Sequence, residues 1–139
     1  MGLQPHYTKL KEAWLRGERG RESSLDLMFH AWMHWADPPF VTGLEDDPDA
    51  LRIWREIFER FGGVGSTDPE FLFVARVMSI ITPWALGEEA EWRRNASELD
   101  RKLRMSASSG LSPRTFEGRG EYGKYFSHQL AADAPPTGD

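Results

Sequence analysis

A carboxylate and two imidazoles recur at one-turn intervals between residues 26 and 34. Asp26, His30 and His34 occupy positions i, i+4 and i+8, so in a helix they share one face. Two imidazoles and a carboxylate are ligands that zinc, iron or manganese accept, with coordination positions left open. The spacing therefore favours one functional hypothesis, a metal-binding helical protein or enzyme with zinc or iron as its cofactor.

A purely structural role explains the same three residues. Asp26 lies near the expected start of a helix, where a carboxylate complements the helix dipole. No glutamate lies between the histidines, as it does in the zinc-protease motif. His6 and His128 are too remote in sequence to be assigned to the same site. Buried histidines that only form hydrogen bonds are the favoured interpretation, so no cofactor is expected, and the metal site is the alternative.

Helical periodicity accounts for most of the chain, with proline and glycine between the periodic segments. In the segment that begins with Asp68 and Pro69, only Arg76 and Ser79 interrupt the apolar residues from 71 to 81. A helix that is apolar nearly all round is normally buried, so we expect this helix at the centre of the core. The predicted helices cover residues 7–16, 23–37, 47–61, 68–81, 88–105 and, more weakly, 122–130.

An internal repeat is suggested by the alignment of residues 10–44 with residues 54–88, at an offset of 44 and without a gap. We therefore predict an all-α fold of two tandem helical hairpins, with a period of about 44 residues, followed by C-terminal helices. Such a fold is a short array of the HEAT or TPR type or an orthogonal helical bundle; chance similarity between amphipathic helices is the alternative to duplication. Residues 1–131 are expected to form one domain and residues 132–139 a disordered tail.

Each copy ends in a corner of the form Pro-aromatic-x-x-Gly. The two corners are Pro39 to Gly43, with Phe40 as the aromatic residue, and Pro83 to Gly87, with Trp84. Proline stops the preceding helix and glycine permits the turn. We expect the aromatic ring to fold back onto the core.

The aligned copies differ at an aromatic cluster in the second helix. Trp32 and Trp35 align with Arg76 and Ser79, and Met28 aligns with a leucine. Clusters of methionine and aromatic residues are characteristic of binding surfaces, so Met28, Trp32 and Trp35 form the candidate docking site. The alternative, weighted above it, is that the C-terminal segment covers this side through Phe116, Tyr122 or Phe126.

Composition excludes several classes of protein. The 139 residues contain no cysteine and carry a net charge of −5, which excludes disulfides and thiolate chemistry and disfavours nucleic acid as a partner. Neither a signal peptide nor a membrane span is evident, so we expect a soluble, cytoplasmic protein without membrane contact.

The leading functional interpretation is a non-enzymatic module for protein–protein interaction, an adaptor that binds a partner protein or a second copy of itself. No catalytic residues are assigned in this interpretation. A third alternative is an acidic inhibitor that mimics nucleic acid, although the acidic residues gather at helix starts and do not spread over one face.

Overall fold

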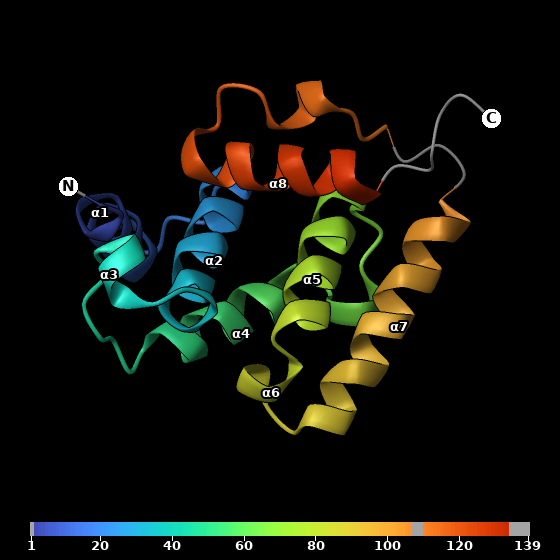
Figure 1. The fold of residues 1–139 in the computed structure, drawn as a ribbon, viewed down its shortest axis with the longest axis horizontal. Coiled ribbons are helices and arrows are strands. Elements are labelled where there is room, and N and C mark those ends of the chain that lie inside the picture. Colours follow the sequence, from blue (N-terminus) through green and yellow to red (C-terminus); the bar gives the residue numbers. More distant parts are fainter. Residues whose placement is uncertain (1, 107–109, 134–139) are drawn as a thin grey trace.

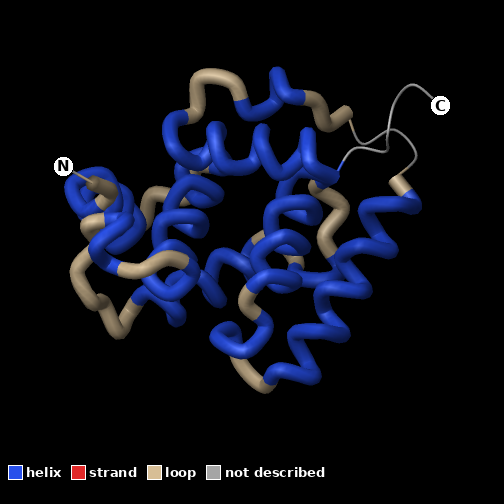
Figure 2. Tube along the Cα trace, viewed as in Figure 1, coloured by secondary structure: helices blue, strands red, loops and turns tan. Residues whose placement is uncertain are grey.

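The computed structural model describes residues 2–106 and 110–133, and every regular element in these ranges is helical (Figure 2). The all-α prediction is confirmed. The elements are α1 (Gln4–Leu15), α2 (Arg21–Ala36), α3 (Pro39–Thr42), α4 (Ala50–Arg60), η1 (Gly63–Gly65), α5 (Pro69–Ile81), α6 (Pro83–Leu86), α7 (Glu89–Met105), η2 (Pro113–Phe116) and α8 (Gly120–Asp133). Within the described ranges, no helix has both the length and the apolar character needed to cross a membrane.

Local sequence explains where several helices begin and end. Asp68 caps α5, because its side chain accepts hydrogen bonds from the backbone N–H groups of Glu70 and Phe71. Gly43 ends α3 with a φ of 72°, in the left-handed region that favours glycine. The predicted start of α2 is wrong, since the helix begins at Arg21, two residues before the predicted range of 23–37.

Helix α5 lies at the centre of the structure, as its apolar sequence predicts. It packs along α7, whereas α2 packs against α1 and α4. Helix α8 lies across one end of α2 and α5 (Figure 1). Phe73, Val74 and Met78 of α5 are completely buried.

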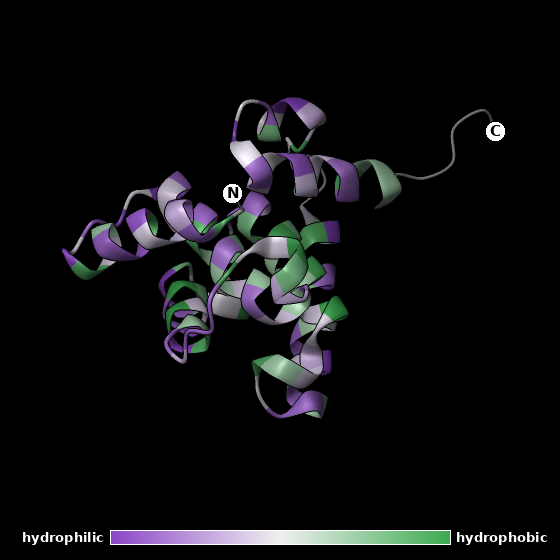
Figure 3. Ribbon diagram, turned by 60° about the vertical axis from the view of Figure 1, so that its left-hand side comes forward, coloured by the Kyte–Doolittle hydropathy of each residue, from purple (hydrophilic) through white to green (hydrophobic). Residues whose placement is uncertain are grey.

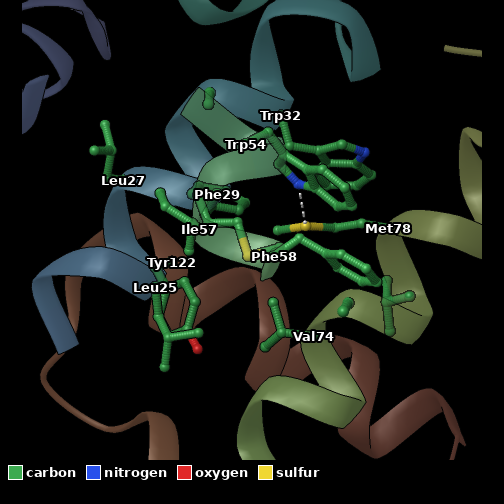
Figure 4. Close-up of a cluster of buried hydrophobic side chains, with 14 of the residues drawn as sticks. Leu25, Leu27, Phe29, Trp32, Trp54, Ile57, Phe58, Val74, Met78 and Tyr122 are labelled. Carbon is green, nitrogen blue, oxygen red and sulfur yellow. Dashed lines mark hydrogen bonds between the residues drawn. The ribbon is translucent and has the colours of Figure 1, made fainter. Parts of the chain in front are cut away.

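Aromatic side chains fill the core between these helices. Trp54 of α4 donates its indole hydrogen bond to Met78 Sδ at 3.0 Å (Figure 4) and stacks on Phe58 with ring centroids 5.4 Å apart. At the other end, Phe29 of α2 meets Phe126 of α8 at 5.7 Å. Hydrophobic residues accordingly gather where the helices meet, whereas the outer helices carry more hydrophilic residues (Figure 3).

The order of elements agrees with the proposed repeat, but the packing differs between the copies. Each copy runs through two helices and a four-residue helix that begins at Pro39 or Pro83. The predicted second hairpin would pair α4 with α5, yet α4 packs mainly on α2 and α5 on α7. The fold is therefore described as a helical bundle, and the period of about 44 residues stays a prediction.

Two finer predictions are wrong. The corner rings do not fold back onto the core, since Phe40 is 88% exposed and Trp84 is 59% exposed. The predicted tail begins too early, because Ala132 and Asp133 continue α8. Residues 134–139 of that predicted tail lie outside the described residues.

Candidate metal centre

The side chains of His6 and Asp26 connect α1 to α2. His6 Nε2 donates a hydrogen bond to Asp26 Oδ2 at 2.7 Å. The His6 side chain is 54% exposed, whereas that of Asp26 is 23% exposed. The contact places an accessible imidazole beside a more enclosed carboxylate.

His30 lies one turn after Asp26 and is almost completely buried. Its Nδ1 donates to the backbone oxygen of Asp26 at 2.8 Å and lies 3.2 Å from Asp26 Oδ1. Because the backbone oxygen takes this N–H, Asp26 Oδ1 is a buried carboxylate oxygen without a hydrogen bond among the described residues. Buried polar atoms normally have a partner, so this oxygen calls for an explanation.

The three side chains converge closely enough to share an ion. One ligand atom from each of His6, Asp26 and His30 lies within 4.8 Å of the others. Ligand atoms about 2 Å from a zinc ion stand roughly 3–3.5 Å apart, which is comparable with the separations in this cluster. The hydrogen bond from His30 Nδ1 to the backbone oxygen of Asp26 is of the kind that orients metal-ligating histidines.

The carboxyl group of Asp26 is held in its ionised form. Burial by itself raises the pKa of Asp26, but the interactions with His30 and His6 outweigh that effect and lower the pKa below its usual value. An ionised carboxylate is the form that ligates a metal. The cluster therefore presents a charged oxygen ligand near neutral pH.

His34 does not join this cluster, so the grouping of Asp26, His30 and His34 predicted from the spacing is wrong in its third member. A separation of eight residues corresponds to a rise of about 12 Å along a helix, too far for Asp26 and His34 to share one ion. His34 Nδ1 instead donates to backbone oxygens of its own helix, and its ring packs on Tyr7 at 4.5 Å.

A cavity of about 350 Å³ opens beside the cluster. Its lining includes His6, Glu22 and Asp26 together with Arg119 and Tyr122. Three protein ligands leave coordination positions open on a metal, and this cavity provides room next to them for water or a small ligand.

Two lining residues of the cavity, Arg119 and Tyr122, are held by the buried carboxylate of Glu70 in α5. Arg119 Nη1 lies 2.7 Å from Glu70 Oε2, and the Tyr122 hydroxyl donates to the same oxygen at 2.5 Å. Burial and the neighbouring Glu70 charge raise the pKa of Tyr122, which keeps the hydroxyl protonated. Arg119 and Tyr122 are thus connected to the core through Glu70 of α5.

The candidate docking site predicted from sequence is not exposed. Met28 and Trp32 are buried, at 0% and 1% exposure, and Trp35 is only partly exposed. Tyr125 of α8 covers Trp32, with ring centroids 5.5 Å apart. The prediction of a binding surface there is wrong, because the C-terminal segment packs over this side of α2. The alternative interpretation expected such cover, but it did not name Tyr125.

Sequence reasoning missed His6 because its partner lies 20 residues further along the chain. One local signal was present, since His6 precedes Leu10 by four residues and Leu10 belongs to the apolar stripe of α1. The position of His6 in the sequence therefore indicates that its side chain lies at the edge of the buried face of α1.

Comparison with protein-family models, curated proteins and solved structures finds no match to this chain.

Proposed function

We propose that this protein binds a divalent transition metal, zinc or iron, through His6, Asp26 and His30. The observation that carries the proposal is the convergence of these three side chains, from two helices, within 4.8 Å. This proposal takes up the metal hypothesis made from the sequence, with His6 in the place of His34.

The chemistry of the ligand set supports this proposal. Two histidines and one carboxylate form the ligand set of many iron and zinc sites with open positions. The buried oxygen of Asp26 without a hydrogen bond would gain a partner in the ion. A metal with an open position also lowers the pKa of bound water and polarises bound oxygen ligands, and the adjoining cavity admits such ligands.

The competing explanation is that the hydrogen bond between His6 and Asp26 only holds α1 on α2, without any metal. We call this arrangement a clip. Both explanations predict some loss of stability when His6 or Asp26 is replaced. Only the metal site predicts that an added ion binds in stoichiometric amount and stabilises the folded protein, since a ligand that binds the folded state alone raises the free energy of unfolding.

The test is elemental analysis of untagged protein that is freed of metal with a chelator, incubated with zinc or iron(II), and desalted. We expect one ion per chain and a higher melting temperature. Asp26→Asn keeps the shape of the side chain but removes its charge, and His6→Ala removes an exposed ligand, so both variants should lose the ion.

His34→Ala and His128→Ala are the matched controls, because both histidines lie outside the cluster. They should retain the ion. A wild-type protein that takes up neither metal, or a His6→Ala variant that retains it fully, would show that the cluster is only a clip.

A further inference from the structure

A second cavity, of about 580 Å³, is lined by residues of α2, α3 and α8 and by residues 2 and 3. We call it the α2–α8 cavity. Small molecules bind in cavities of about 300–1,000 Å³ that have a mostly apolar lining and a few polar groups. The described lining residues of this cavity and of the cavity beside the candidate metal centre do not overlap. Binding in the α2–α8 cavity is therefore independent of the proposed metal.

Apolar side chains make up much of the lining of the α2–α8 cavity. They are Leu3, Phe29, Met33 and Val41. Phe29 and Met33 are buried, whereas Val41 is 61% exposed, so the apolar lining extends from the core to the surface. The ring of Tyr125, also in the lining, lies 5.5 Å from that of Phe29. These side chains can remove a hydrocarbon group of a ligand from water.

The lining carries one negative charge that is not compensated. Glu121 and Lys124 lie 3.5 Å apart and offset each other. The carboxylate of Asp37 forms no hydrogen bond or ion pair with the described residues. His128 also lines the cavity and is counted as neutral at pH 7. The unpaired carboxylate therefore favours a ligand with a positive charge.

The end of α2 adds to this negative charge. In a continued helix, the backbone oxygens of His34 and Trp35 would accept hydrogen bonds from the N–H groups four residues later. Those positions are Pro38 and Pro39, which have no N–H group. The C-terminal end of a helix carries a partial negative charge and attracts cations. Asp37 follows the last residue of α2 and lines the cavity, so this end of the helix lies at the cavity.

Tyr125 provides a further contact for a cation. Burial raises the pKa of Tyr125, and the negative charge of Asp37 raises it further, so the hydroxyl stays protonated. The face of an aromatic ring attracts an ammonium group. A carboxylate and an aromatic ring in the lining of one cavity are therefore suited to the same cation.

We propose that the α2–α8 cavity binds a small organic amine, which consists of an ammonium group on an aryl or alkyl body. The ammonium group binds the Asp37 carboxylate at the end of α2, and the hydrocarbon body packs on Met33 and Val41. A carboxylic acid of the same size meets Asp37 with like charge and binds more weakly.

The test uses three compounds that differ mainly in the charge of the head group: 2-phenylethylamine, 2-phenylethanol and 3-phenylpropanoate. Each is titrated into the intact, ¹⁵N-labelled protein, and binding is followed by the NMR shifts of the backbone amides. The protein is first freed of metal with a chelator, so that the amine has no metal to ligate. We expect the amine to bind most tightly and the carboxylate least tightly, with the shifted amides in the second half of α2, in α3 and in α8.

Two pairs of variants locate the binding. Asp37→Asn should weaken binding of the amine by about fivefold or more and leave that of the alcohol unchanged. Asp46→Asn, at an exposed position outside the cavity, makes the same change of charge and should leave both unchanged. Val41→Ser should weaken both compounds by about threefold, whereas Ile80→Ser, also at an exposed apolar position, should weaken neither.

Several results would overturn the proposal. They are absence of binding, binding of the carboxylate as tight as that of the amine, and shifted amides confined to other helices. Equal weakening of the amine by Asp37→Asn and Asp46→Asn would also overturn it, because the effect would then come from the net charge of the protein.

Discussion

At the scale of single residues, Thr82 binds both Trp32 and Trp35, which the sequence analysis predicted to lie on a docking surface. Its Oγ1 accepts the indole hydrogen bonds of Trp32 at 2.9 Å and Trp35 at 3.3 Å. The same hydroxyl donates to the backbone oxygen of Met78 at 3.1 Å. The indoles are therefore anchored in the core by a polar contact as well as by burial.

We predict that Trp32→Ala lowers the free energy of unfolding by about 3–5 kcal/mol, the cost of truncating a buried aromatic side chain. Trp32→Phe retains most of the apolar contact, loses the hydrogen bond to Thr82, and should cost less. Urea denaturation followed by circular dichroism measures both values. A loss below about 0.5 kcal/mol for Trp32→Ala would mean that the side chain is exposed in solution.

Asp47 links α1 to the start of α4. Its Oδ2 accepts hydrogen bonds from the Tyr7 hydroxyl at 2.6 Å and from Lys11 Nζ at 2.8 Å. Burial raises the pKa of Asp47, but the hydrogen bonds from Lys11 and Tyr7 outweigh it and lower the pKa to about 2. The ionised carboxylate thus stabilises the folded state above the ordinary aspartate pKa of about 4.

This stabilisation should disappear as the pH falls from about 4 through about 2. Asp47→Asn should lower the free energy of unfolding at pH 7 by about 1 kcal/mol, allowing for solvent screening, and its difference from wild type should vanish near pH 2. The exposed neighbour Asp46 supplies the control, Asp46→Asn. A difference that stays constant between pH 7 and pH 2 would contradict this role of the charge.

At this scale, sequence spacing predicted part of the candidate site. Asp26 and His30 are one turn apart in one helix, so their proximity follows from helix geometry alone. His6 approaches them only because α1 packs on α2, and such a contact between elements has no periodic signature. The burial of Trp32 likewise depends on α8, which lies more than 80 residues further along the chain.

At the scale of elements, the close approach of α8 to η2 depends on Gly123. A Cβ at this position would lie 2.1 Å from the backbone oxygen of Phe116 and 3.1 Å from Arg119 Cβ. These two elements carry the aromatic and charged groups that close the end of the core, including Phe116 and Tyr122.

We predict that Gly123→Ala lowers the free energy of unfolding by about 1–3 kcal/mol, because backbone atoms must separate to admit the methyl group. The higher helix propensity of alanine, worth up to about 1 kcal/mol, offsets only part of this cost. Gly65→Ala is the control, since no atom lies within 4 Å of a Cβ there. Thermal or urea denaturation measures the effect, and equal stability of the two variants would refute the predicted clash.

The helical elements were largely predictable from the sequence, whereas the side chains that each helix buries or exposes were not. The apolar run from residue 71 to 81 indicated a central helix, and α5 is that helix. Pro39 and Pro83 were expected to stop the preceding helices, and α2 and α5 end shortly before them, but the short helices that begin at these prolines were not predicted. The prediction that the rings of Phe40 and Trp84 fold back onto the core was wrong, because a ring beside a turn is buried only if another element covers it.

At the scale of the whole molecule, α1 is attached to the bundle by polar contacts to two other helical regions. His6 meets Asp26 of α2, Lys11 meets Asp47, and Trp14 donates to Glu56 of α4 at 3.2 Å. A metal held by His6, Asp26 and His30 would add a bond between α1 and α2. Metal binding is therefore expected to stabilise the packing of α1 as well as to create a reactive centre.

The most direct test of the metal centre is isothermal titration of the metal-free protein with zinc, with Asp26→Asn and His34→Ala measured in parallel. We predict a single site per chain in the wild type and in His34→Ala, and loss of that site in Asp26→Asn. Absence of heat in the wild type, or equal binding by Asp26→Asn, would contradict the assignment of His6, Asp26 and His30 as metal ligands.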